Sequence, residues 1–174
     1  MERRIRFELL YAKHGPAVKA YVLRRAPASL ADDLVAEVFV VCWRRFDELP
    51  VDPLPWLLGV ARRVLATQRR GERRSVALHE RIARTGTPPI EASAGAVDEE
   101  LLAALQRLSE SDRELLALIA WEGLSPAQAA GVLGIRPATA RVRLHRARRR
   151  LGVALGREQD RPSACSSLPM EASP

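Results

Sequence analysis

The densest group of anion-binding side chains in this sequence lies between Leu124 and Leu151. This segment is expected to form two short helices joined by a tight turn. Its second half lacks carboxylates and is rich in arginine: Arg136, Arg141, Arg143, Arg146, Arg148, Arg149 and Arg150. Like charges along one helix repel each other, and an ordinary solvated helix usually mixes both signs. We therefore expect this helix to bind a polyanion, and the major groove of duplex DNA is the natural partner of a helix-turn-helix.

Local signals define both helices of this unit. Ser125 can accept a hydrogen bond from an early helical N–H, Pro126 suits the first helical position, and Gln128 completes a capping box. Gly134 supplies the left-handed residue that ends the first helix, and Pro137 begins the second. Apolar residues at three- and four-residue spacing indicate the side of the second helix that faces a core: Ala140, Leu144, Ala147 and Leu151.

The composition agrees with a nucleic-acid partner. The chain has 174 residues, a formal net charge of +7 and 47% hydrophobic residues. This length allows two small helical domains, and the positive charge favours a polyanion, although a GC-rich genome would also replace lysine by arginine. Two separated cysteines, Cys42 and Cys165, make neither a disulfide framework nor a metal cluster. Without a long apolar run or a signal peptide, we expect a cytoplasmic protein with no membrane insertion, metal or cofactor.

Apolar periodicity divides the first part of the chain into helices. The Gly15-Pro16 pair is expected to break a helix, and Ser29 to cap a longer one that has Asp32 and Asp33 in its first turn. The last of these helices has a basic side made of Arg62, Arg63, Arg69 and Arg70. The expected helices are Arg4–His14, Pro16–Arg25, Ser29–Glu48 and one from Asp52 or Pro53 to about Arg74.

The periodicity fails after this domain and returns near Asp98. The region between them is rich in Gly, Ser, Thr and Pro and is expected to be a flexible linker, with room for a short helical patch at Val76–Ala83. The flexibility of this linker would let the two domains lie far apart on one extended target. In the second domain, Ser111 is expected to cap a helix that Gly123 ends. The sequence thus predicts an all-α protein of two small helical domains, 4–74 and 98–155, with a linker at 75–97 and a disordered tail at 156–174.

Two parts of the chain resemble the sigma-70 superfamily of bacterial RNA polymerase sigma factors, specifically the small extracytoplasmic-function (ECF) group, which keeps only regions two and four. Asp32–Phe46 and Pro55–Arg70 are similar to region two, and Ser109–Leu151 is similar to region four. The order and the spacing also match. The resemblance implies a region-two helical bundle and a region-four helix-turn-helix. It also implies a function, which is to bind core RNA polymerase, direct it to promoters and help to open the DNA.

The resemblance further implies which residues make these contacts. The −35 duplex would be read by Arg136, Thr139, Arg141, Val142, Arg143, His145, Arg146, Arg148 and Arg149. Of these, we expect Arg141 and Arg146 to contact base edges and the arginines at 143, 148 and 149 to hold phosphates. The opened −10 strand would follow Arg62, Arg63, Arg69 and Arg70. Core polymerase would bind Asp33, Leu34, Ala36, Glu37, Phe39 and Val40, although Leu34 and Phe39 equally suit an ordinary core. Trp43 and Trp56 are expected to pack in the core.

Two other functions are open from the residues alone. A self-sufficient helix-turn-helix regulator would bind a palindromic DNA site without polymerase. An enzyme with an accessory DNA-binding module is less supported, because the sequence shows no Gly-rich phosphate loop, paired-carboxylate constellation or metal-ligand spacing. We therefore expect no catalytic residues and no small-molecule substrate. The resemblance adds one more partner, an anti-sigma factor that covers the polymerase- and DNA-binding faces.

Overall fold

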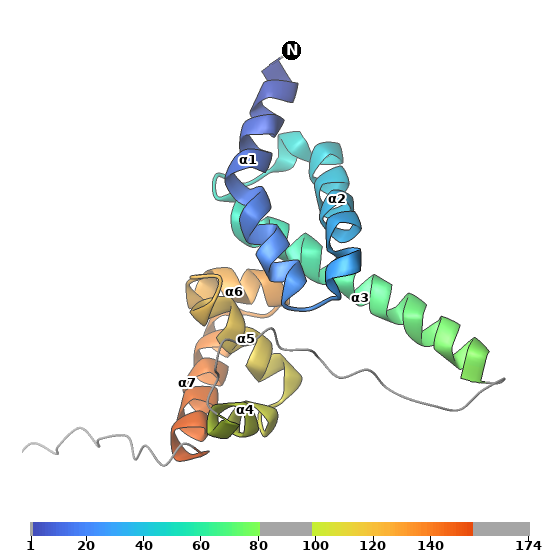
Figure 1. Cartoon of the computed structure of the whole chain (residues 1–174). Coiled ribbons are helices and arrows are strands. Elements are labelled where there is room, and N and C mark those ends of the chain that lie inside the picture. Colours follow the sequence, from blue (N-terminus) through green and yellow to red (C-terminus); the bar gives the residue numbers. More distant parts are fainter. Residues whose placement is uncertain (1, 81–98, 155–174) are drawn as a thin grey trace, which may run out of the picture.

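The computed structural model describes residues 2–80 and 99–154, and the regular elements of this described part are all helices (Figure 1). They are α1 (Glu2–Leu23), α2 (Ala28–Arg44), the short 3-10 helix η1 (Phe46–Glu48), α3 (Pro53–Glu80), α4 (Glu99–Gln106), α5 (Glu110–Ala120), α6 (Pro126–Leu133) and α7 (Pro137–Ala154). The predicted all-α fold class is confirmed. Within the described ranges, no helix combines the length and the apolarity that a membrane crossing requires. The expected tail and most of the expected linker lie outside the described residues.

α1 is one continuous helix, so the predicted break at Gly15-Pro16 is wrong. Pro16 lies inside the helix, and its ring is exposed. A proline normally crowds the residue before it, but Gly15 has no Cβ to clash. Phe7 and Val18, on either side of the proline, pack against the same hydrophobic core. Burial of both halves against one surface outweighs the backbone hydrogen bond that the proline removes.

α2 begins before the predicted cap. Pro27 occupies the N-cap position without a side-chain hydrogen bond, and Ser29 lies inside the first turn. The predicted acidic residues therefore fall outside that turn, and Asp32 instead pairs with Lys19 of α1, whose Nζ lies 2.7 Å from the carboxylate. The helix ends at Arg44, earlier than expected, and η1 follows it. Asp32 therefore pairs with α1 and does not occupy the first turn, where it was expected to interact favourably with the helix dipole.

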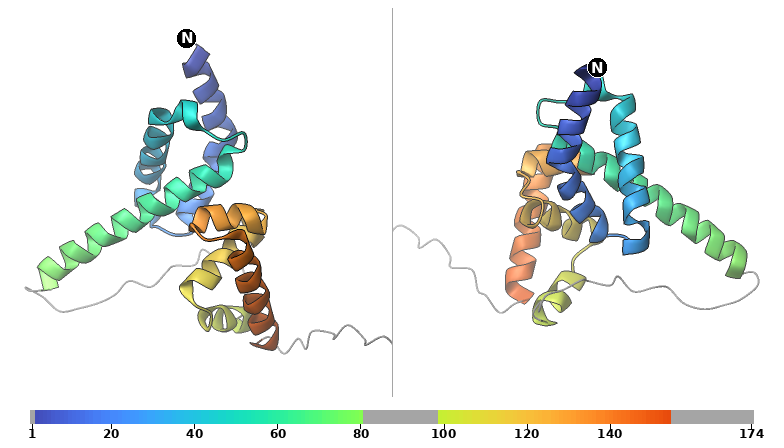
Figure 2. Two further views of the ribbon diagram at one scale, coloured as in Figure 1. Left: turned by 180° about the vertical axis from the view of Figure 1, so that it is seen from behind. Right: turned by 45° about the horizontal axis from the view of Figure 1, so that its top comes forward.

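The elements on either side of the expected linker also differ from the prediction. α3 continues to Glu80, so the part of the expected helical patch from Val76 to Glu80 is helical, but it prolongs the preceding helix. The last turns of α3 extend beyond the other helices in both views of Figure 2. α5 begins two residues earlier than expected, because Ser109 is its N-cap and accepts a hydrogen bond from the Asp112 N–H at 3.2 Å. Ser111, the predicted cap, lies inside the helix.

The helix-turn-helix formed by α6 and α7 matches the prediction. Ser125 Oγ accepts from the Gln128 N–H at 3.3 Å, and Gln128 Oε1 accepts from the Ser125 N–H at 2.8 Å, which completes the capping box. Gly134 ends α6 in the left-handed region with φ of 68°, and α7 begins at Pro137. Ile135 fills the turn, where its N–H donates to the Ala130 carbonyl at 3.0 Å. The angle between the two helices is therefore set by local residues.

The variant Ser125→Ala tests the role of this cap. Alanine cannot accept the hydrogen bond from the Gln128 N–H, so the free energy of unfolding should fall by about 1 kcal/mol in urea titrations. Ser29→Ala is the matched control, because Ser29 is exposed and does not cap α2. Equal losses in the two variants would contradict the assigned cap.

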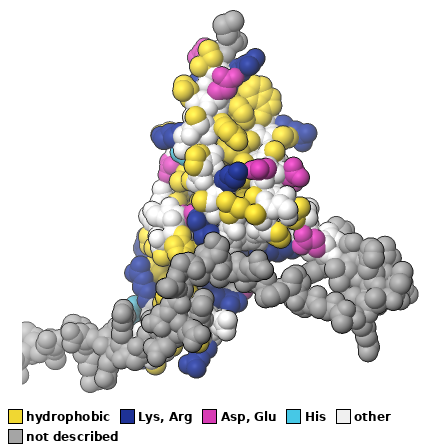
Figure 3. Space-filling view, in the orientation of Figure 1, with side chains coloured by type: hydrophobic (Ala, Val, Ile, Leu, Met, Phe, Trp, Pro, Cys, Tyr) yellow, Lys and Arg dark blue, Asp and Glu magenta, His cyan; other side chains and the backbone are white. Residues whose placement is uncertain are grey.

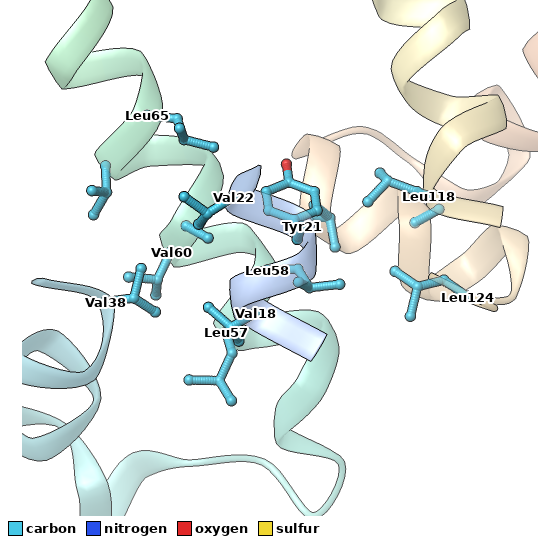
Figure 4. Close-up of a cluster of buried hydrophobic side chains, with 14 of the residues drawn as sticks. Val18, Tyr21, Val22, Val38, Leu57, Leu58, Val60, Leu65, Leu118 and Leu124 are labelled. Carbon is cyan, nitrogen blue, oxygen red and sulfur yellow. The ribbon is translucent and has the colours of Figure 1, made fainter. Parts of the chain in front are cut away.

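The buried side chains form one core that joins both halves of the chain (Figure 4). Val18 and Leu57 lie between the helices of the first half, and Leu115 lies between those of the second. α6 packs directly against α3. A Cβ on Gly59 of α3 would lie 3.9 Å from the Cα of Val132 in α6, so the two helices approach closely. The sequence does not predict this contact, since it suggests domains held far apart.

Candidate nucleic-acid interface

α7 presents a cationic surface on the side opposite its buried residues. Ala140, Leu144 and Ala147 are buried against the other helices, as the periodicity predicts. Most of the predicted DNA-contacting residues are exposed: Arg136, Thr139, Arg141, Val142, His145, Arg146, Arg148 and Arg149. With short apolar side chains inside and guanidinium groups outside, the helix can lie close to its own domain and still reach into a major groove.

Arg143 differs from the other arginines of α7, because it faces its own domain. Its Nε lies 3.1 Å from Asp112 Oδ1, and its Nη2 donates to Ser111 Oγ of α5. Arg150 Nη1 lies 3.9 Å from the other carboxylate oxygen of the buried Asp112. The structure therefore places Arg143 where it fixes α7 on α5, and its contact with a phosphate stays a prediction. Asp112 positions α7 from within the domain, a role that its sequence context does not indicate.

The variant Asp112→Ala tests this attachment of α7. It leaves the half-buried Arg143 without its carboxylate, so unfolding should require about 1–2 kcal/mol less, as measured by thermal denaturation. Glu8→Ala is the control, because Glu8 pairs with Arg4 at 2.8 Å on the surface and such exposed pairs contribute roughly 0–1 kcal/mol. A loss no larger than the control's would show that Asp112 does not hold α7.

α3 carries a second group of exposed arginines. Residues seven apart lie on nearly the same side of an α-helix, and this spacing relates Arg62 to Arg69 and Arg63 to Arg70. Arg70 Nη2 donates to Thr67 Oγ1 at 3.0 Å. Arg69 Nη2 donates at 3.1 Å to a backbone oxygen in the turn that follows α1. All four residues are exposed, so they give this side of α3 a cationic surface.

A groove lies beside this surface, between α2 and α3. Its volume is about 270 Å³. The lining combines charged, hydroxyl and aromatic side chains: Glu37, Val41, Arg45, Trp56, Val60, Arg63, Val64 and Thr67. Cationic, hydrogen-bonding and flat apolar groups in one groove suit a nucleobase that has left its stack. Arg63 belongs to both the groove and the cationic side of α3.

α2 divides the six predicted polymerase-contacting residues into two groups. Asp33, Ala36, Glu37 and Val40 are exposed, and Val40 is 48% exposed. Leu34 and Phe39 are each only 4% exposed and belong to the hydrophobic core. These two side chains therefore stabilise α2 from within, and their contact with the polymerase stays a prediction.

Trp43 lies at the surface, contrary to the expectation that it packs in the core. It is 41% exposed, with its ring edge-to-face against Phe7 at a centroid distance of 5.1 Å. The Arg3 guanidinium lies 4.9 Å from the ring centroid. Trp56 is half-buried against the core as expected. Hydrophobic side chains cover much of the face over α1 and α2 in Figure 3, and an exposed Trp is typical of a protein interface.

Comparison with known protein families agrees with this arrangement, in which α7 and α3 carry basic surfaces and α2 exposes acidic and apolar residues. The description "Sigma-70 region 2" matches residues 10–75, and "Sigma-70, region 4" matches residues 98–151. The ECF RNA polymerase sigma factor SigL of Mycobacterium tuberculosis is 35% identical over 156 residues, covering 84% of this chain and 86% of SigL. The ECF sigma factor EcfG of Rhodopseudomonas palustris is 31% identical, covering 80% of each chain.

Solved structures give the same family. A sigma factor RpoE in complex with the anti-sigma factor NepR from Bartonella quintana is similar with a TM-score of 0.64 and 26% identity, covering 88% of this chain and 98% of that one. CnrH in complex with the cytosolic domain of CnrY is similar with a TM-score of 0.56 and 26% identity, over 88% and 89% of the two chains. The fold and surfaces define a two-part DNA-binding transcription protein. The chain belongs to the ECF group of RNA polymerase sigma factors, as the resemblance predicted.

Proposed function

We propose that this sigma factor binds core RNA polymerase through α2 and contacts a promoter through α7 and α3. Residues 4–74 form the region-two domain in this proposal and residues 98–155 the region-four domain. The protein acts in the cytoplasm as a subunit that directs catalysis by the polymerase, with no catalytic residues or cofactor of its own. The observation that carries the proposal is the pairing of two separate exposed arginine surfaces with one exposed acidic and apolar helix face.

α7 reads the upstream duplex element. Arg141 and Arg146 are exposed and lie near the start of the helix and one turn further on, so both can reach guanine edges in a major groove. A bidentate arginine–guanine contact contributes roughly 1–3 kcal/mol of base discrimination. Arg148 and Arg149 follow on the exposed part of the helix and hold phosphates, which fix the orientation of the protein. Arg136, just before the helix, reaches a phosphate at the other end.

α3 takes up the opened strand of the downstream element. The arginines at 62, 63, 69 and 70 attract its phosphates, and the groove between α2 and α3 accepts one unstacked base. Extruding a base from the duplex costs a few kcal/mol, and the contacts that the base makes in the groove offset this cost. The family often has Asn and Asp where this chain has Arg63 and Thr67. Both residues line the groove, so the base preference at this position is expected to be particular to this chain.

α2 docks on the polymerase through Asp33, Ala36, Glu37 and Val40. Two acidic residues beside an exposed valine suit a partner surface that is basic around an apolar centre. We include Trp43 in this surface, because it is one turn further along α2 from Val40 and is also exposed. Together they give an apolar centre with a charged rim.

A footprint with and without core polymerase separates this function from a self-sufficient regulator. The sigma factor should protect an upstream and a downstream element only when core polymerase is present. Strong protection of a palindromic site by the free chain would instead show an independent regulator.

An anti-sigma factor is the remaining proposed partner. RpoE and CnrH, both similar in fold to this chain, were solved with NepR and with the cytosolic domain of CnrY, respectively. We propose that a comparable protein covers the α2 and α7 surfaces here. An affinity pull-down from the native cells should recover such an inhibitor, and recovery of polymerase without any inhibitor would count against this part of the proposal.

A further inference from the structure

The exposed side of α7 has an apolar residue at its centre. Successive residues lie roughly 100° apart around an α-helix, so Val142 is roughly 200° away from Ala140 and from Leu144. Both of these residues are buried, whereas Val142 is 50% exposed. Among the described residues, Val142 lies outside the hydrophobic core and outside the partly buried side chains that pack against it. α4 and α5 lie beside α7 in Figure 1, and the valine faces away from this contact.

Polar and cationic side chains surround this valine. Residues three and four positions apart are neighbours on the surface of a helix. The neighbours of Val142 are all exposed: Ala138, Thr139, His145 and Arg146. No carboxylate occurs among residues 137–154 of α7. The charges of this helix therefore attract a polyanion, and the valine lies where the edges of the base pairs would come closest.

Val142 does not stabilise the helix better than its alternatives would. At exposed positions, where packing does not decide, residues of high helix propensity are the best choice, and valine has a lower propensity than alanine or arginine. Most of the other residues of α7 are alanine and arginine. Since Val142 adds neither core packing nor helix propensity, a contact outside the chain explains it best.

Val153 is a second exposed valine of α7, but it lies too far along the helix to share this role. It is 73% exposed and comes eleven positions after Val142. This spacing is about three turns, so the two valines lie on nearly the same side, roughly 16 Å apart along the axis. The major groove is only about 12 Å wide, and a recognition helix contacts bases with its N-terminal residues. Val142 is therefore the valine that reaches the bases.

A valine can make a favourable contact with only one kind of base in the major groove. The C5-methyl group of thymine is the apolar group that base edges present there. Opposite any other base, the valine would cover polar atoms that lose their hydrogen bonds to water without a replacement. In a helix, valine also keeps one χ1 rotamer in about 90% of cases, so its methyl groups are held in place before DNA binds.

We propose that Val142 determines specificity by contacting a thymine C5-methyl group in the upstream promoter element. The inference rests on the proposed binding of α7 to this duplex. Val142 and Arg146 are four positions apart, which is about 6 Å along the helix axis. This distance corresponds to about two steps of 3.4 Å between base pairs. The thymine should therefore lie within about two base pairs of the guanine that Arg146 binds.

Replacement of single thymines by uracil tests the contact, because it removes the C5-methyl group and keeps the base pair. The probe is a promoter duplex from which transcription by core polymerase depends on this sigma factor. Each thymine of its upstream element, on either strand, is replaced in turn, and fluorescence anisotropy at fixed salt measures the affinity of core polymerase with the full chain. Loss of one buried methyl group should weaken binding about fourfold at one position.

Val142→Ala shows whether this residue senses the methyl group. Alanine lacks the two Cγ methyl groups and favours the helix, so the variant should fold, as circular dichroism can verify. The affinity ratio between thymine and uracil at the responding position should fall from about fourfold to less than about twofold. Val153→Ala is the matched control, which removes the same two groups from the same side of α7 and should keep the fourfold ratio.

Three results would overturn the inference while the proposed function stands. They are equal affinity for thymine and uracil at every position, a fourfold ratio that persists in Val142→Ala, and an upstream element with no thymine on either strand. A persistent ratio would show that the methyl group acts through another residue or through the shape of the DNA. Absence of any transcript that depends on this sigma factor would refute the proposed function, and this inference with it.

Discussion

Replacing Arg141 and Arg146 together by alanine is expected to reduce promoter-directed transcription by about 100-fold or more. Each side chain is exposed on α7, and each bidentate contact to guanine contributes roughly 1–3 kcal/mol of discrimination. Loss of both should therefore remove several kcal/mol from recognition of the upstream element. Transcription from a promoter carrying the cognate element, measured with core polymerase at fixed salt, gives the effect.

The double variant Arg4→Ala with Arg107→Ala is the matched control. It removes the same net charge from exposed positions outside the proposed DNA surfaces, so its effect should stay within a few-fold. A similar loss in both double variants would mean that the chain binds DNA through net charge alone. Unchanged recruitment after substitution at 141 and 146 would contradict the assignment of α7 as the reading helix.

The second large effect is expected on α2. Glu37→Arg with Val40→Arg should weaken binding to core polymerase by about 100-fold, since hot-spot changes in an interface cost about 2 kcal/mol or more. The variant reverses the charge that suits a basic partner and adds a charge at an apolar centre. Both positions are exposed, so the fold should be retained. Titration of labelled protein with purified core enzyme measures the affinity.

Glu8→Arg with Leu9→Arg is the control for this experiment. It makes comparable changes on exposed residues of α1, where Leu9 is 65% exposed. Circular dichroism of both variants excludes loss of helix. If the α1 control weakened polymerase binding as much as the α2 variant, the docking surface would not be the one assigned here.

The parts of this fold that local residues determine could be predicted from the sequence. The capping box at Ser125, the left-handed Gly134 and the first residue of α7 depend only on neighbours a few positions away. The prediction of which α7 residues are buried was also confirmed, because apolar residues at helical spacing mark the side of a helix that faces the core. These features are why the cationic helix could be recognised before the structure was known.

Features that depend on tertiary contact could not be predicted in the same way. The Gly15-Pro16 pair signals a break, yet packing on both sides of it keeps α1 continuous. Asp112 is one carboxylate in an acidic helix start, and only the fold shows that it pairs with Arg143. Arg25 contacts Glu114 and Glu122, which are 89 and 97 positions away in the chain, and a single sequence carries no signal for such contacts.

The predicted site residues illustrate the same limit. The resemblance groups Leu34, Phe39 and Val40 together as polymerase contacts, but the orientation of α2 decides which of them reach solvent. Trp43 follows the same spacing and was expected inside. It is instead 41% exposed, with one edge-to-face contact to Phe7 of α1.

Reconstituted transcription tests the central claim most directly. Core polymerase from the same cells is incubated with fragmented genomic DNA, with and without this sigma factor, and the 5′ ends of the transcripts are sequenced. The account predicts a discrete set of new starts, preceded by one shared pair of upstream and downstream elements. Transcripts identical to those made by core polymerase alone would contradict it.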